Sequence, residues 1–192
     1  MCYSTIGEIS LNRPHNKMQT RWLYILIGNN NTGKTTLQKK IIKLLCGLDY
    51  VKLPTNVRSP VTHKDASRRL ETLFTANRSF QEKREEYKTI KEYFSNHFLE
   101  ASTAIMSSHS HSARDEIDEM IREGKRRFYN VAAVFLSNSI DDEIRGFSST
   151  LNWDERIYLE NPVAHTPEEI ENNITACSVY LTDVIIGKHA RR

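Results

Sequence analysis

The feature that most constrains the fold is a continuous apolar run, Trp22–Ile27, that stops abruptly at Gly28. Its aromatic and β-branched residues do not alternate with polar ones, which is typical of a strand buried on both faces of a parallel sheet. After a polar loop, residues 35–46 carry apolar side chains at helical spacing, and Gly47 follows as a candidate C-cap. This strand–loop–helix unit predicts an α/β protein.

Further patterns extend the prediction along the chain. A helix is expected from Ser112 to Gly124, and the last helix is expected to begin at Thr166 as N-cap with Pro167 in its first turn. Strands separated by helices imply right-handed crossovers. We therefore predict a three-layer α/β/α sandwich with a mostly parallel sheet of about five strands. Besides the first strand, the predicted strands are 103–106, 130–136, 157–159 and, as a candidate fifth, 50–53.

Residues 62–100 have the pattern of a helical segment. Thr62 with Asp65, and Ser79 with Glu82, are capping pairs three residues apart, and apolar residues follow each pair at helical spacing. One predicted helix therefore runs through Phe74, and the next carries a stripe of aromatic residues that we assign to the core. Residues 1–20 show no periodicity, which predicts an irregular leader before a single domain spanning residues 21–192.

Composition excludes several classes of protein. The 192 residues, 39% hydrophobic and 27% charged, are ordinary for one globular domain. No apolar run approaches the ~20 residues of a membrane helix, and the first residues do not have the pattern of a secretion signal. Cys2, Cys46 and Cys177 are odd in number and form no CxxC pair, so we expect no disulfide framework and a reducing, cytoplasmic setting.

The net charge of +3 is unevenly distributed. Residues 34–64 include seven basic residues and one acidic residue, Asp49. A local basic stretch on a nearly neutral chain favours a small anionic ligand over a long nucleic acid, which usually requires a broad basic face. The alternative is a helix face whose lysines point into solvent.

The loop between the first strand and the first helix carries the clearest motif. Residues 28–35, Gly-Asn-Asn-Asn-Thr-Gly-Lys-Thr, fit G-x-x-x-x-G-K-[ST] at every fixed position. Gly28 and Gly33 allow backbone N–H groups to converge on phosphate oxygens, and the helix that follows adds its positive N-terminal end. Lys34 can reach the β- and γ-phosphates, and the Thr35 hydroxyl can ligate Mg²⁺. The predicted triphosphate-binding residues are Gly28, Asn29, Asn30, Asn31, Thr32, Gly33, Lys34, Thr35 and Thr36.

On these residues, and more loosely on the order of elements over residues 21–187, the chain resembles the P-loop NTPases, in particular the small nucleoside/nucleotide-kinase-like branch. The resemblance implies ATP and Mg²⁺ as cofactors, a helical substrate-binding insert at 62–100 and a lid at 137–154. It also implies that a terminal strand–helix pair at 156–187 lies beside the nucleotide base. The chain departs from the family where Ser107-Ser108-His109 follows a central strand without the usual acidic residue.

Asp65, Arg68 and Arg69 are the candidates for handling the phosphate acceptor. A carboxylate at this point could accept a hydroxyl proton, while the arginines could clamp a phosphate or carboxylate. The alternative is that Asp65 only caps a helix and the arginines are solvated. Arg58 has a similar pair of interpretations, and Arg145 is the single arginine of the predicted lid. With Lys34, we take Asp65 and Arg145 as candidate catalytic residues, and Arg58, Arg68 and Arg69 as candidate substrate-binding residues.

The histidines near residue 110 form a second candidate group. Ser108 or His109 could sense the γ-phosphate or orient water at the sheet edge, where ligands gather in doubly wound folds. The alternative is a polar loop that leads into the next helix. A metal site at His109 and His111 is not favoured, because no cysteine or acidic ligand lies at metal-site spacing.

These features favour a kinase that transfers the γ-phosphoryl group of MgATP to a small anionic or hydroxyl-bearing acceptor, such as a nucleoside, nucleotide or metabolite. The alternative is an ATPase or a nucleotide-controlled regulatory module that acts on a protein or nucleic-acid partner. Guanine specificity has no support, because no N-K-x-D motif follows a late strand. No membrane partner is expected, and a nucleic acid remains an alternative partner that is not favoured.

Overall fold

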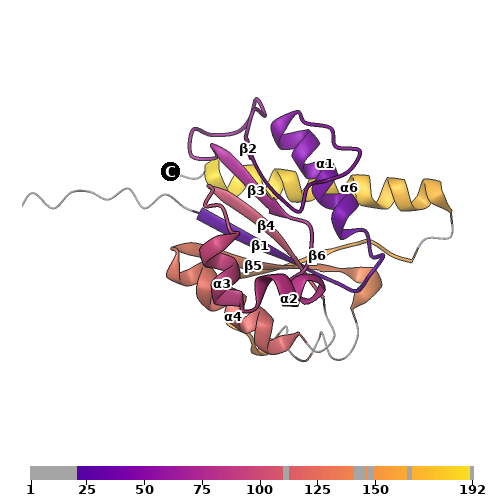
Figure 1. Ribbon diagram of the computed structural model, residues 1–192. Coiled ribbons are helices and arrows are strands. Elements are labelled where there is room, and N and C mark those ends of the chain that lie inside the picture. The colour runs from indigo at the N-terminus through magenta and orange to yellow at the C-terminus, as the bar shows by residue number, and fades with distance from the viewer. Residues whose placement is uncertain (1–20, 110–112, 141–145, 147–148, 164–165, 191–192) are drawn as a thin grey trace, which may run out of the picture.

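The apolar run forms strand β1 (Arg21–Ile27), which lies inside a six-stranded sheet of order β2-β3-β4-β1-β5-β6 (Figure 1). The computed structural model describes residues 21–109, 113–140, 146, 149–163 and 166–190. The predicted leader at 1–20 lies outside them. The other strands are β2 (Asn56–Pro60), β3 (Thr72–Ala76), β4 (Thr103–Ser108), β5 (Tyr129–Leu136) and β6 (Glu155–Leu159).

Helices cover both faces of this sheet. Helices α1 (Lys34–Cys46) and α6 (Pro167–Ala190) pack together on one face (Figure 1). The 3₁₀ helix η1 (Gln81–Lys83), α2 (Arg84–Tyr87), α3 (Ile90–Asn96) and α4 (Arg114–Arg126) belong to the other side. A second 3₁₀ helix, η2 (Ser137–Ser139), follows β5. The three-layer α/β/α arrangement is therefore confirmed.

Strand β1 shows why its sequence is apolar throughout. Leu23, Ile25 and Ile27 pack into the core on the α3–α4 side, whereas Trp22, Tyr24 and Leu26 pack into the core against α1 and α6. Successive side chains of a strand point to opposite faces, so a strand covered on both faces has no solvent side.

The predicted ends of two helices are also confirmed. Gly47 has a φ of +68° after α1, and its N–H donates to the Lys43 carbonyl at 3.0 Å. At the start of α6, Thr166 Oγ1 accepts from the Glu169 N–H at 3.1 Å, and the Glu169 carboxylate accepts from the Thr166 N–H at 3.2 Å. This reciprocal pair is the capping box.

The helix predicted from Thr62 through Phe74 is wrong. Residues 72–76 are strand β3, which pairs antiparallel with β2 in a hairpin. Leu73 and Phe74 are adjacent apolar residues that enter the cores on opposite faces of the sheet, as neighbours on a strand do. The strand proposed at 50–53 is also wrong, because those residues form a bend and coil, and β2 supplies the additional strand. In place of one long helix, η1, α2 and α3 occupy the rest of the predicted insert.

Strand direction decides where a ligand can bind. Four of the five strand pairings are parallel, so β1, β3, β4, β5 and β6 all end at one edge of the sheet. From β1 the chain moves outward to β3, returns to β4, and then crosses β1 to reach β5. The order therefore reverses around β1, and open α/β sheets bind ligands in the crevice at such a point. None of the helices in the described part of the chain is both long and apolar enough to cross a membrane.

Candidate functional site

The loop after β1 begins at the point where the strand order reverses. The N–H of Gly28 donates to the Ser108 carbonyl at 3.2 Å, so the loop starts from the ends of β1 and β4. The backbone then enters the left-handed region at Asn31, with φ +61°, and at Gly33, with φ +95°. The Gly33 carbonyl accepts the first helical bond from Leu37 at 2.8 Å. The N-terminus of α1 is thereby joined directly to the loop.

Residues from distant parts of the chain fix the shape of this loop. Asn161, just after β6, donates from Nδ2 to the Thr32 carbonyl at 3.0 Å, and Thr32 Oγ1 donates to the Asn29 carbonyl at 2.9 Å. A Cβ at Gly33 would overlap Cδ1 of Ile174 on α6, so a larger residue would require that side chain to shift in addition to a strained left-handed backbone. Asn161 is not among the residues predicted for the site, although a polar residue just after a predicted strand was a usable signal.

Lys34 is the buried cation of the loop. Its residue is 8% exposed, and Nζ donates to the carbonyls of Gly28 and Asn29, each at 2.6 Å. Burial lowers the Lys34 pKa to about 8, partly opposed by the charge of Glu82. Thr35 and Thr36, in the first turn of α1, are exposed. The lysine therefore lies beneath the loop, while the two hydroxyl-bearing residues face the open side.

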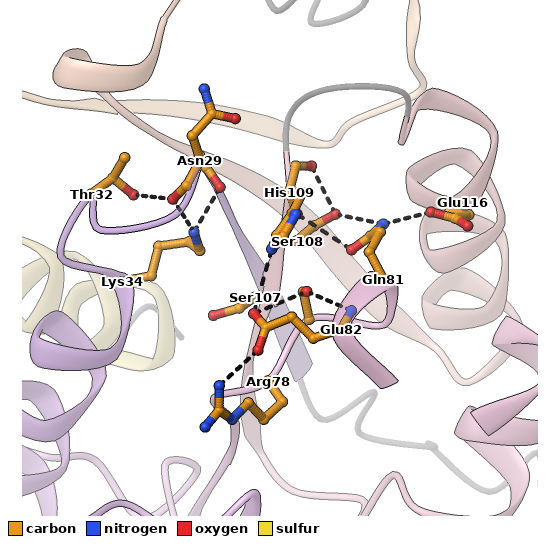
Figure 2. A network of polar contacts seen from close by, with 12 residues as sticks. Asn29, Thr32, Lys34, Arg78, Gln81, Glu82, Ser107, Ser108, His109 and Glu116 are labelled. Carbon is orange, nitrogen blue, oxygen red and sulfur yellow. Dashed lines mark hydrogen bonds and ion pairs between the residues drawn. The ribbon is translucent and has the colours of Figure 1, made fainter. Parts of the chain in front are cut away.

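Glu82 stands across from this loop (Figure 2). Its carboxylate accepts from Arg78 Nη1 at 2.8 Å and from Ser79 Oγ at 3.2 Å, and it lies 3.4 Å from His109 Nε2. Burial by itself raises the pKa of this carboxyl, but the hydrogen bonds from Arg78 and His109 outweigh it and hold the pKa below its ordinary value. Glu82 is therefore an ionised, held carboxylate that faces the lysine.

The sequence pattern predicts Glu82 only as the partner of Ser79 in a capping pair. That pair exists, since Ser79 Oγ accepts from the Glu82 N–H at 3.2 Å. The position of the pair opposite the loop depends on β3, which brings the chain to the carboxyl edge just before Arg78. Because β3 was interpreted as a helix, the sequence offered no means of placing Glu82 there.

Ser108 and His109 lie at the end of β4, as expected, and join the same network. Gln81 Nε2 donates to Glu116 at 2.6 Å and to Ser108 Oγ at 3.4 Å, while the His109 N–H donates to Gln81 Oε1 at 3.4 Å. Figure 2 shows Ser108, His109 and Gln81 across from Lys34 and Asn29, with Glu116 on the far side of Gln81. His111 and Ser112 lie outside the described residues, within which no group of three or more His, Cys, Asp or Glu could hold a metal ion.

The structure does not bring Asp65, Arg68 and Arg69 to this site. They belong to the connection from β2 to β3, and β3 runs parallel to β1, so the connection lies at the opposite edge of the sheet. The Thr62 N–H there donates to the Leu45 carbonyl at the far end of α1, at 2.8 Å.

The other predicted basic residues are also dispersed. Arg58 is exposed in the middle of edge strand β2, and Arg145 lies outside the described residues. Lys39, Lys40 and Lys43 bond along α1 to the Val51 carbonyl, Glu171 and Asp49, respectively. The basic stretch therefore does not line one pocket.

A cavity of about 300 Å³ adjoins the loop on the side of α6. The described residues that line it come from the loop, from the ends of β5 and β6, and from α6: Asn30, Asn31, Thr32, Gly33, Asn138, Asn161, Pro162, Val163, Ile170 and Ile174. Its walls combine the amide groups of asparagines with the aliphatic side chains of Val163, Ile170 and Ile174.

Comparisons of this chain with protein-family models, with curated proteins and with solved structures found no match.

Proposed function

We propose that this protein is a P-loop NTPase that binds MgATP at residues 28–36 and transfers its γ-phosphoryl group to a small hydroxyl-bearing acceptor. The observation that carries the proposal is the loop itself. It follows the central strand where the strand order reverses, has left-handed turns at Asn31 and Gly33, and leads into α1 with Lys34 beneath it. Backbone N–H groups, a helix N-terminus and a lysine together form an anion-binding arrangement.

The proposed binding step follows from these groups. The loop N–H groups cradle the phosphates, and Lys34 exchanges its two carbonyl contacts for phosphate oxygens. The nucleotide base lies in the cavity lined by Asn138, Asn161 and Ile174. The Thr35 hydroxyl, exposed in the first turn of α1, is an oxygen donor of the kind that Mg²⁺ prefers and would hold the metal. When bound, Mg²⁺ neutralises charge that develops on the transferring phosphoryl group.

Glu82 supplies the carboxylate that P-loop kinases usually carry after a central strand and that is absent after β4. Held by Arg78, Ser79 and His109, it accepts a hydrogen bond from the attacking hydroxyl and orients it toward the γ-phosphate. A groove of about 430 Å³ begins beside η1, between the start of α3 and α4, and is the proposed place for the acceptor. Its lining includes Arg84, Lys88 and Lys91 as well as Asp115 and Glu119, so an acceptor with polar and charged groups fits it.

Hydrolysis is the second candidate function. The Glu82 side chain is 28% exposed, so water can reach the carboxylate that would otherwise orient an acceptor. The same Glu82–His109 pair would then orient a water molecule.

For either reaction the cytoplasm is the proposed setting, because Cys46 and Cys177 are buried free thiols.

Calorimetry with MgATP tests the binding step. Lys34→Ala should weaken binding by about 1.5–3 kcal/mol, roughly 10- to 150-fold, because one charged hydrogen-bonding group is lost. Lys39→Ala is the matched control and should leave affinity unchanged, since Lys39 Nζ donates to the Val51 carbonyl and not to the loop. Equal affinities of wild type and Lys34→Ala would refute the phosphate site.

Product analysis separates the two reactions. Wild type and Glu82→Gln are incubated with MgATP and a panel of nucleosides, nucleotides, small metabolites and 5′-hydroxyl oligonucleotides, and phosphorylated products are detected by mass. A kinase yields a phosphorylated acceptor, and Glu82→Gln binds MgATP but forms little product. Release of inorganic phosphate at the same rate with every acceptor would instead establish hydrolysis.

A further inference from the structure

Gln38 is a fully buried polar residue one turn after Lys34 on α1. Its neighbours Leu37 and Ile41 are core residues. The side-chain Nε2 donates to the carbonyl of Ala76, at 3.2 Å, and to Ser107 Oγ, at 3.0 Å. Its Oε1 is buried and has no hydrogen-bond partner within the described part of the chain. Gln38 thus connects the first turns of α1 to the ends of β3 and β4.

The unpaired Oε1 of Gln38 lowers the stability of the folded state. An unpaired buried acceptor such as Oε1 lowers the folding equilibrium constant roughly 5- to 150-fold. The amide cannot simply turn over, because Oε1 would then face the Ala76 carbonyl. Thr75 Oγ1 and Asn77 Oδ1, on either side of Ala76, are likewise buried without a described partner. A costly buried polar group of this kind calls for an explanation.

The two contacts of Gln38 lead directly to the proposed catalytic groups. Ala76 is the last residue of β3, and the chain reaches Glu82 six residues later. Ser107 precedes Ser108 and His109. One side chain therefore holds both segments that carry the Glu82–His109 pair against the helix that carries Lys34.

We propose that Gln38 is a positioning residue, which sets the distance between the Glu82–His109 pair and the phosphate-binding loop. This role rests on the proposed function, because it concerns the geometry of phosphoryl transfer. Gln38 itself contacts neither phosphate nor acceptor. It acts through the two strand ends that it bonds.

A purely structural glutamine and a positioning glutamine predict different behaviour for Gln38→Met. Methionine has a similar length and fills the core, and it removes Oε1 together with the donor to Ser107 Oγ and the Ala76 carbonyl. If Gln38 positions the site, the variant should still unfold cooperatively in urea, and should bind MgATP with a dissociation constant within about threefold of wild type. Turnover should fall about 5- to 30-fold, because one or two hydrogen bonds no longer hold the catalytic segments. Gln38→Leu provides a second apolar variant.

Hydrogen exchange gives a readout that does not depend on turnover. Without nucleotide, the backbone amides of residues 77–83 should exchange about 5- to 30-fold faster in Gln38→Met than in wild type, while those of β1 are unchanged. Thr182→Val is the matched control, since it also removes a buried unpartnered oxygen, on α6. It should leave both exchange at 77–83 and turnover unchanged.

The outcomes separate this inference from the proposed function. If wild type is active and Gln38→Met retains wild-type exchange and turnover, only the role of Gln38 is overturned. The role is also overturned if turnover falls only in proportion to the fraction of unfolded protein. If wild type neither binds MgATP nor forms product, the proposed function fails and the positioning role fails with it, whatever the exchange data show about the Gln38 contacts.

Discussion

Replacing Gly33 with alanine tests the packing of α6 against the loop. Gly33 has a φ of +95°, and an added Cβ would overlap Cδ1 of Ile174 and lie 3.2 Å from its Cγ1. The left-handed backbone costs an alanine about 1–2 kcal/mol, and the overpacking adds about 1–3 kcal/mol. We therefore expect Gly33→Ala to lower the free energy of unfolding by about 2–5 kcal/mol in urea denaturation followed by circular dichroism.

A double-mutant cycle combines Gly33→Ala with Ile174→Val. The valine lacks the Cδ1 methyl with which the added alanine Cβ collides. Alone it should cost about 0.5–1.5 kcal/mol. In the double variant the collision is relieved while the backbone strain stays, so the two losses should combine to about 1–3 kcal/mol less than their sum.

Gly47→Ala is the control for backbone strain alone. Gly47 also has a left-handed φ, of +68°, but the nearest atom to its added Cβ is Thr62 Oγ1 at 3.7 Å. It should therefore lose only about 1–2 kcal/mol. Additive losses for Gly33→Ala and Ile174→Val, or a Gly33→Ala loss no larger than that of Gly47→Ala, would refute the close packing of α6 on the loop.

Two further predictions concern charge. Burial lowers the Lys34 pKa from 10.5 to about 8, so between these values the unfolded chain binds more protons and the Lys34 contribution makes stability rise with pH. In the proposed function the bound phosphates require the charged lysine, so MgATP affinity should fall about tenfold between pH 7 and pH 9 in calorimetry, and a dissociation constant that stays flat would contradict this. Arg68→Ala with Arg69→Ala, at the opposite sheet edge, should change MgATP affinity and turnover by no more than about twofold. A large loss of turnover in that variant would move the acceptor to that edge.

Local patterns were sufficient for the centre of the fold. The run Trp22–Ile27, the glycines of the loop and the spacing of Leu37 and Ile41 predicted β1, its turn and α1 without any knowledge of distant residues. The capping box at Thr166 marked the start of α6 equally well. These signals are local because each arises from backbone preference or from the periodic burial of one segment.

The same local patterns were ambiguous at residues 72–76. Adjacent apolar residues such as Leu73 and Phe74 fit a helix that is buried along one side, and they also fit a strand buried on both faces. Pairing with β2 and β4 selected the strand, and this depends on residues that are far apart in the sequence. The error moved Asp65, Arg68 and Arg69 toward the expected site and left Glu82 out of it.

The sequence by itself determined that the chain is an α/β protein with the pattern G-x-x-x-x-G-K-[ST] between its first buried strand and its first helix. Only the tertiary structure decided which side chains surround that loop. Glu82, His109, Gln38 and Asn161 come from four separate segments, and they converge because five strands run in the same direction and end at one edge. A motif is encoded by neighbours in the chain, whereas the residues that face it are set by strand order and direction.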